Sequence, residues 1–143
     1  MRTAALFALI AVIACAPKEE ETPPPPPAAA PTVADFAGTW NVASILEGTP
    51  DNVRTTLAGM PDGTWTLTLE GRPNVPVTAS MSGDSLVTQS AEYESVLRQG
   101  VMVTVRTAGV RMDGMMHGNL VATYKTPTGE QVVNGTFIAT KAP

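Results

Sequence analysis

The stretch Thr64-Trp65-Thr66-Leu67-Thr68-Leu69-Glu70 alternates strictly between apolar and polar side chains. Successive side chains of a β-strand point to opposite faces, so this order places Trp65, Leu67 and Leu69 on one face and the threonines with Glu70 on the other. The pattern predicts a strand with one buried face. It is the clearest of several such patterns, and together they decide the fold class.

The same alternation continues along the chain in four further segments. Their apolar positions are expected to face the core: Val75, Val77, Ala79 and Met81; Val101, Val103 and Val105; Leu120, Ala122 and Tyr124; Val133, Gly135, Phe137 and Ala139. Strands are also expected over Trp40–Leu46, Ser85–Ser90 and Tyr93–Leu97. By contrast, Asp51–Ala58 indicates at most one helical turn.

Turn-forming residues separate these segments: Pro61-Asp62-Gly63, Ser82-Gly83-Asp84, Asp113-Gly114 and Pro127-Thr128-Gly129. The result is about eight short antiparallel strands, each with one apolar face. Such strands hide their unpaired edges by closing on themselves or by pairing as two sheets. The economical arrangement is an all-β domain over residues 35–143, folded as a small antiparallel up-and-down barrel.

Composition limits the kinds of partner. The chain has 13 acidic and 9 basic residues, a net charge of −4, and charged residues make up only 15% of it. A mildly acidic chain without a basic cluster argues against nucleic-acid binding. Residues 35–143 are numerous enough to form one hydrophobic core, so a single folded domain is expected.

The N-terminal region carries a targeting signal. Cys15 is the only cysteine, and it follows the apolar run Ala4–Ala14, which begins shortly after Arg2. This run is shorter than the roughly 20 residues that span a bilayer, and it is typical of a secretory signal. Val12-Ile13-Ala14-Cys15 resembles a bacterial lipobox, which implies cleavage after residue 14 and lipid attachment to Cys15. The alternatives are a plain signal peptide followed by a free thiol, or an uncleaved helix with a buried thiol.

Residues 15–34 are expected to form a disordered tether between the lipid and the domain. The five prolines Pro23–Pro27 favour an extended polyproline II conformation, and Glu19-Glu20-Glu21 would be repelled by anionic head groups. Ala16 follows the cysteine where many lipoproteins of the inner membrane have Asp, and this analogy favours the outer membrane. We therefore expect a cell-envelope protein that is attached to the membrane through Cys15.

A second resemblance concerns the first expected strand of the domain. Gly38-Thr39-Trp40 is similar to the Gly-x-Trp start of lipocalins and related calycins. This resemblance implies that Trp40 closes one end of the barrel and that Gly38 allows close backbone approach there. In that family an arginine near the last strand packs on the tryptophan, and the nearest cation here is Lys141. A barrel of eight strands can hold one small ligand.

Two arginines are candidates for contacting a ligand at the mouth of the barrel. A guanidinium group suits carboxylates and phosphates, so Arg72 and Arg98 would bind an anionic head group there. In the alternative interpretation both arginines form surface ion pairs with glutamates close in sequence, which are Glu70, Glu92 and Glu94.

Four other residues are candidate contacts for an apolar ligand: Trp65, Tyr93, Met115 and Met116. Aromatic rings supply apolar area, and methionine adapts to varied apolar shapes. In the alternative interpretation these side chains simply fill the core.

The sequence offers little chemistry for catalysis. His117 is the only histidine, and Asp113 is the one carboxylate near it, so no metal site is expected. Neither a Gly-x-Ser-x-Gly motif nor a glycine-rich phosphate loop occurs. We predict that the chain is not an enzyme and needs no cofactor, with a hydrolase that uses His117 as the remaining alternative.

Two functions therefore fit the sequence. The first is a lipid-anchored barrel that binds a small apolar or amphipathic ligand, which requires a continuous cavity of roughly 300 Å³ or more. The second is an interaction module, such as an envelope adaptor or a protease inhibitor presented on a stalk. That function predicts a filled barrel with an exposed apolar patch.

Overall fold

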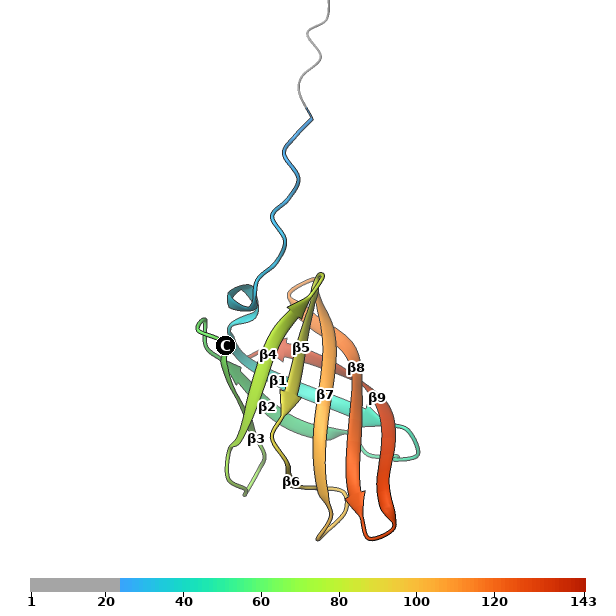
Figure 1. Ribbon diagram of the computed structural model, residues 1–143. Coiled ribbons are helices and arrows are strands. Elements are labelled where there is room, and N and C mark those ends of the chain that lie inside the picture. Colours follow the sequence, from blue (N-terminus) through green and yellow to red (C-terminus); the bar gives the residue numbers. More distant parts are fainter. Residues whose placement is uncertain (1–23) are drawn as a thin grey trace, which may run out of the picture.

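The computed structural model describes residues 24–143, which fold almost entirely into β-strands (Figure 1). A one-turn 3-10 helix, η1 (Val33–Phe36), comes first. The strands are β1 (Gly38–Leu46), β2 (Val53–Gly59), β3 (Thr64–Thr68), β4 (Val75–Ser82), β5 (Ser85–Ser90), β6 (Tyr93–Glu94), β7 (Met102–Met112), β8 (Met115–Thr126) and β9 (Gly129–Lys141). The predicted signal peptide (1–14), Cys15 and the first part of the predicted tether lie outside the described residues.

The strands form one closed barrel. The hydrogen-bonded order is β5-β4-β3-β2-β1-β9-β8-β7-β6, and β5 also pairs with β7, which closes the sheet. All pairings are antiparallel, including the one between β1 and β9. The short β6 pairs with β7 beyond the end of β5, so it continues the same wall. The predicted antiparallel up-and-down barrel of eight strands is confirmed, with β6 as an additional strand.

The turn residues determine where the strands reverse. Asp113 and Gly114 form the two-residue loop between β7 and β8, with φ angles of 52° and 78°, and Met112 pairs with Met115 across it. Two-residue hairpin loops need positive φ at both positions, which the Asp-Gly pair tolerates. The other three predicted turn signals also lie at strand junctions, so the order of strands along the chain follows from local chemistry.

The helical turn expected over Asp51–Ala58 is wrong, because Val53–Gly59 forms strand β2. This strand pairs with β1 on one side and with β3 on the other. Its inward positions include Thr55 and the buried Gly59 beside Val53 and Leu57. Because Thr55 and Gly59 have no large apolar side chain, the sequence does not show the apolar alternation that marks a strand.

The strand expected over Tyr93–Leu97 is much shorter than predicted. Only Tyr93 and Glu94 pair with β7. Ser95 Oγ then accepts the backbone N–H groups of Leu97 and Arg98, both at 3.1 Å, and this side chain turns the backbone away from the sheet. The predicted number of barrel strands is therefore right, but one of the eight is β2 and not the strand expected over Tyr93–Leu97.

Aromatic rings lie directly on glycines of neighbouring strands. The Trp65 ring covers Gly59 on β2, and the Phe137 ring covers Gly109 on β7 and Gly118 on β8. A β-carbon at any of these glycines would overlap the ring that covers it. These contacts let large side chains pack flat against the inner wall, because a glycine leaves room for the ring.

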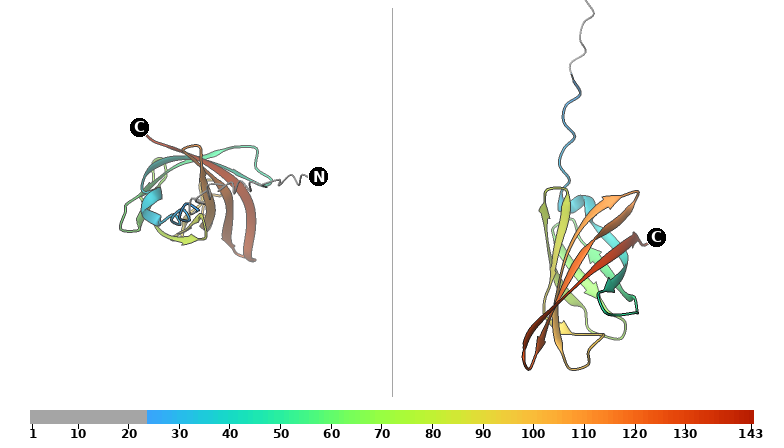
Figure 2. Two further views of the ribbon diagram at one scale, coloured as in Figure 1. Left: turned by 90° about the horizontal axis from the view of Figure 1, so that it is seen from above. Right: turned by 90° about the vertical axis from the view of Figure 1, so that its right-hand side faces the viewer.

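Helix η1 closes the barrel at the end where the tether segment arrives (Figures 1 and 2). Phe36 and Trp40 are fully buried there, and the indole Nε1–H of Trp40 donates to the carbonyl oxygen of Phe36 at 2.8 Å. Arg111 Nη1 on β7 donates to the carbonyl oxygen of Asp35 at 3.0 Å. The Asp35 carboxylate accepts hydrogen bonds from the backbone N–H and hydroxyl of Thr32, which lower its pKa. The helix is therefore held to the barrel from both sides.

Lys141, near the end of β9, also covers this closed end. Its Nζ atom lies 5.6 Å from the centroid of the Trp40 ring, within the range of a cation–π contact. Gly38 has a φ angle of 127°, and a β-carbon there would come within 2.8 Å of Lys141 Cε. A cation thus lies over the tryptophan where the calycin resemblance implies an arginine, while membership of that family stays a prediction.

Candidate ligand cavity

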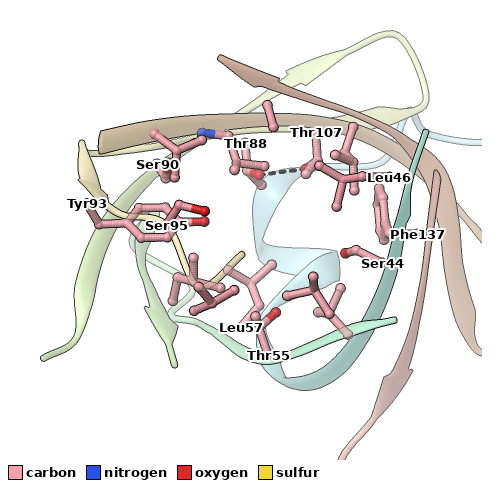
Figure 3. Close-up of a pocket in the computed structure, with 18 of the residues that line it drawn as sticks. Ser44, Leu46, Thr55, Leu57, Thr88, Ser90, Tyr93, Ser95, Thr107 and Phe137 are labelled. Carbon is pink, nitrogen blue, oxygen red and sulfur yellow. Dashed lines mark hydrogen bonds between the residues drawn. The ribbon is translucent and has the colours of Figure 1, made fainter. Parts of the chain in front are cut away.

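The barrel encloses a cavity of about 90 Å³ between the two ends (Figure 3). Most of its wall is apolar. Each of the eight barrel strands contributes at least one residue to the wall, in strand order Val42, Leu57, Leu67, Val77, Thr88, Val103, Leu120 and Phe137. The cavity is smaller than the roughly 300 Å³ expected for a binder of drug-sized ligands. The barrel is therefore neither open like a wide ligand pocket nor completely filled.

Hydroxyl groups interrupt the apolar wall. Thr88 and Thr107 lie on the neighbouring strands β5 and β7, and their Oγ1 atoms are hydrogen-bonded at 2.6 Å (Figure 3). Ser90 Oγ accepts the backbone N–H of Val105 at 2.8 Å, at the point where β5 separates from β7. Ser44 and Thr55 contribute two more hydroxyls from β1 and β2. Each hydroxyl can accept or donate a further hydrogen bond, so the cavity suits a ligand with a single polar group.

No charged side chain lines this cavity in the part of the chain that the structure describes. The phenol of Tyr93 forms part of its wall. Burial raises the pKa of the Tyr93 phenol to about 12, and the nearby Tyr124 phenol adds to the effect. The phenol therefore stays neutral at physiological pH, and the interior favours an uncharged group over an ion.

The end of the barrel opposite η1 is covered by the segment Ser95–Gly100, which we call the lid segment (Figure 1). Val96 and Leu97 line the cavity with one side while 42% and 37% of their surfaces remain exposed. A short loop, rather than paired strands, thus borders the cavity at this end.

Arg98 connects the lid segment to the nearby strands β8 and β9. Its Nη1 atom donates to Oε1 of Gln131 on β9 at 2.6 Å, and its guanidinium carbon lies 4.1 Å from the centroid of the Tyr124 ring on β8. Both contacts use the planar guanidinium, which can stack on an aromatic face and donate a hydrogen bond at its edge.

The structure does not bring the two predicted head-group arginines into one hollow. Arg72 Nη1 donates to the backbone carbonyl oxygen of Glu94 at 2.7 Å and lines a separate depression beside Tyr93. Arg98 lines a different hollow with Tyr124 and Gln131. Neither arginine forms an ion pair with a glutamate within residues 24–143, where the salt bridge found joins Lys125 to Glu92. Each arginine therefore donates a hydrogen bond to a different part of the barrel, Arg72 to Glu94 and Arg98 to Gln131.

The four predicted apolar contacts divide into two groups. Tyr93 and Met116 line the cavity. Trp65 is buried against Gly59 and does not line the cavity, and its indole Nε1 has no hydrogen-bond partner among residues 24–143. Met115 is half-buried on β8, where side chains alternate, so it faces outward beside the inward-facing Met116.

His117 also points away from the interior. It lies between the inward-facing Met116 and Gly118, and its strand partners are Val110 and Ile138. Its side chain makes no hydrogen bond within residues 24–143, and no group of three or more metal-binding side chains was found in that part of the chain. The histidine thus lies in an apolar neighbourhood on the outer wall.

Sequence reasoning missed the hydroxyls of the cavity and the role of Ser95. A signal for two of them was present, because Thr88 and Ser90 follow the buried Leu86 at the spacing of a strand and so share its face. The turn at Ser95 had no comparable signal, since a serine that accepts backbone N–H groups looks the same in sequence as one exposed on a strand.

Comparison with known proteins assigns no family: no family model matches the chain, and a search of curated proteins finds no match. Among the described residues, no helix is both long and apolar enough to cross a bilayer. The residues of the barrel and the N-terminal sequence are therefore what indicates a function for this chain.

Proposed function

We propose that this chain is a lipid-anchored cell-envelope protein whose barrel binds a slender, uncharged apolar ligand. The observation that carries the ligand proposal is the cavity of about 90 Å³, with its apolar wall and its hydroxyl groups. The envelope part rests on the lipobox-like Val12-Ile13-Ala14-Cys15 and on the tether sequence that follows it.

The cavity wall limits the chemistry of the ligand. A charged group inside would lose its hydration, and no side chain of opposite charge lines the cavity to compensate within the described residues. A single hydroxyl or carbonyl group on the ligand would find partners in Ser44, Thr55 or the Thr88–Thr107 pair. Apolar cavities of about 150 Å³ hold benzene. The smaller cavity here suits a narrow aliphatic group rather than a ring system.

The decisive experiment is native mass spectrometry of the protein purified from the envelope of its own host. A bound neutral amphiphile would add a defined mass to the wild-type protein. Ala122 lines the cavity and is fully buried, so Ala122→Leu fills the space and should remove that mass. Val121→Leu adds bulk to the outer face of the same strand and should leave it in place. An unliganded mass for the wild type, or equal retention by both variants, would count against the proposal.

The proposal includes no catalytic step. His117 faces outward, away from the cavity hydroxyls, and neither a serine nor a carboxylate is hydrogen-bonded to it in residues 24–143. A purified domain that hydrolyses esters in a way that depends on His117 would favour the hydrolase alternative instead.

An interaction module is the second candidate, and one feature of the outer wall supports it. Ile45 on β1 and Ile138 on β9 are 53% and 48% exposed. Ile45 pairs with Thr136, two residues from Ile138, so the two isoleucines are diagonal neighbours on one face. A photo-crosslinker at Ile138 that captures one defined envelope protein, while a crosslinker at the outward-facing Asn41 does not, would support this function.

A further inference from the structure

The lid segment Ser95–Gly100 is a self-contained loop. Ser95 Oγ accepts N–H groups from Leu97 and Arg98, and the backbone N–H of Val101 donates to the carbonyl oxygen of Arg98 at 3.1 Å. Gly100 N–H donates to Oε1 of Glu94 at 2.9 Å. Because these bonds lie within the loop and the residues beside it, the loop can keep its own shape while it changes its position over the barrel.

The side-chain hydrogen bond that joins this loop to strand β9 comes from Arg98. Its guanidinium stacks on Tyr124 and donates to Gln131, on strands β8 and β9. Gln131 is exposed and Arg98 is half-buried, so water can reach and compete for this contact. Contacts of this kind at partly exposed sites are weak enough to break often.

A second hollow lies just outside the lid segment. It has a volume of about 440 Å³, and the loop between β1 and β2 forms its other side. This mouth hollow and the inner cavity share Leu46, Leu97 and Tyr124 in their walls. Leu97 belongs to the lid segment and Tyr124 lies under Arg98, so the side chains that separate the two spaces are those that the Arg98 contact holds in place.

We propose that Ser95–Gly100 is a movable lid and that Arg98 is the latch that decides how large a ligand the barrel admits. With the latch closed, the interior admits a narrow aliphatic group. When Arg98 leaves Tyr124 and Gln131, Leu97 moves away and the inner cavity joins the mouth hollow. The joined space exceeds the roughly 300 Å³ at which ligand pockets usually begin. This inference deepens the ligand-binding proposal and rests on it for its function, but the motion of the lid can be measured without a ligand.

The ligand-free test is NMR of the lid methyl groups in the wild type and in Arg98→Ala, with a soluble paramagnetic agent that broadens the signals of methyl groups exposed to solvent. The broadening of the Leu97 signals should increase about twofold in the variant, because loss of the cation–π contact and the charge-assisted hydrogen bond lets the inward side of Leu97 reach solvent. The methyl groups of Leu86, which is 1% exposed and does not line the cavity, serve as the internal reference and should keep their line width. Equal broadening of Leu97 in both proteins, or increased broadening of Leu86 as well, would overturn the latch.

The ligand test uses the apolar fluorophore N-phenyl-1-naphthylamine, which is too large for the closed cavity. Arg98→Ala should raise its association rate constant about tenfold in stopped-flow fluorescence, and Gln131→Ala should raise it about threefold because the Tyr124 contact remains. Arg106→Ala is the matched control, because Arg106 is exposed on the outer face of β7 between the inward-facing Val105 and Thr107, and its loss should leave the rate unchanged.

The two tests separate the two proposals. Stronger broadening of the Leu97 signals in Arg98→Ala without any fluorophore binding would support the lid and contradict ligand binding. Fluorophore binding at the same rate in the wild type and Arg98→Ala would support ligand binding and overturn the latch. Equal acceleration by Arg106→Ala would also overturn it, because the effect would then reflect general loosening of the barrel.

Discussion

Replacing Tyr93 by Phe should remove a specific loss of stability at high pH. The phenol of Tyr93 is buried in the cavity wall, and burial raises its pKa from 10.0 to about 12. Between these two values the unfolded chain releases the Tyr93 proton while the folded protein still holds it. Folding stability therefore falls as pH rises through this window, and below pH 10 the group makes no pH-dependent contribution.

The size of the effect follows from the pKa difference. Each unit corresponds to about 1.4 kcal/mol, so a shift of about two units sets an upper limit near 2.7 kcal/mol, of which about 2.3 kcal/mol is lost by pH 12, where half of the folded-state phenol has ionised. Tyr93 is only partly shielded from water, which reduces the expected loss to about 2 kcal/mol. High pH also acts on the rest of the chain, to the same extent in both proteins. The informative quantity is therefore the difference between wild type and Tyr93→Phe.

The assay is urea unfolding at half-unit pH steps from 9 to 12, monitored by tryptophan fluorescence. Both Trp40 and Trp65 are buried, so their emission reports on loss of the core. The unfolding free energy of the wild type should decline relative to Tyr93→Phe only above pH 10. Parallel curves for the two proteins up to pH 12 would refute the assignment of Tyr93 as a buried, neutral phenol.

Three further changes test other parts of the structure. Gly59→Ala forces a methyl group into the Trp65 ring, so urea unfolding should show a free energy of unfolding about 3 kcal/mol lower than in the wild type, but less than about 1 kcal/mol lower when the same change is made in a Trp65→Leu background. Equal losses of stability in the two backgrounds would contradict the packing of Trp65 on Gly59. Trp40→Phe leaves the buried carbonyl oxygen of Phe36 without its hydrogen-bond donor, and it should lower the free energy of unfolding by about 2 kcal/mol and speed amide exchange in η1. Unchanged amide exchange in η1 would show that this hydrogen bond does not hold the helix on the barrel. Cys15→Ser should shift the protein from the membrane to the soluble fraction of its host with the thermal unfolding temperature of the domain unchanged, and continued membrane association would rule out lipid attachment at this residue.

The barrel itself was predictable because alternation is a local property of the sequence. Trp65, Leu67 and Leu69 mark an inner face without any knowledge of their partners, and the Asp113-Gly114 pair marks a reversal. Strand β2 escaped prediction because its inner face includes Thr55 and Gly59. Gly59 fits there because the Trp65 ring of β3 packs on it, and Thr55 fits there because it faces the cavity.

The candidate site was less predictable, because a cavity depends on how side chains from distant strands fill the interior. Tyr93 and Met116, which are predicted as ligand contacts, line it, yet the same reasoning also selects Met115, which faces the other way. The lid depends on Arg98 reaching Gln131, 33 residues along the chain, and on a turn formed by a serine side chain. Neither contact leaves a periodic signal in the sequence.

The central claim is that the barrel interior contains accessible apolar space, and xenon titration followed by methyl NMR tests it most directly. Xenon is small and apolar enough to enter cavities of this kind. The account predicts saturable shifts of the methyl groups of Leu57, Val103 and Met116, which line the cavity, with none at the outward-facing Ile45. Interior methyl groups that do not respond, or that shift only as much as Ile45, would contradict it.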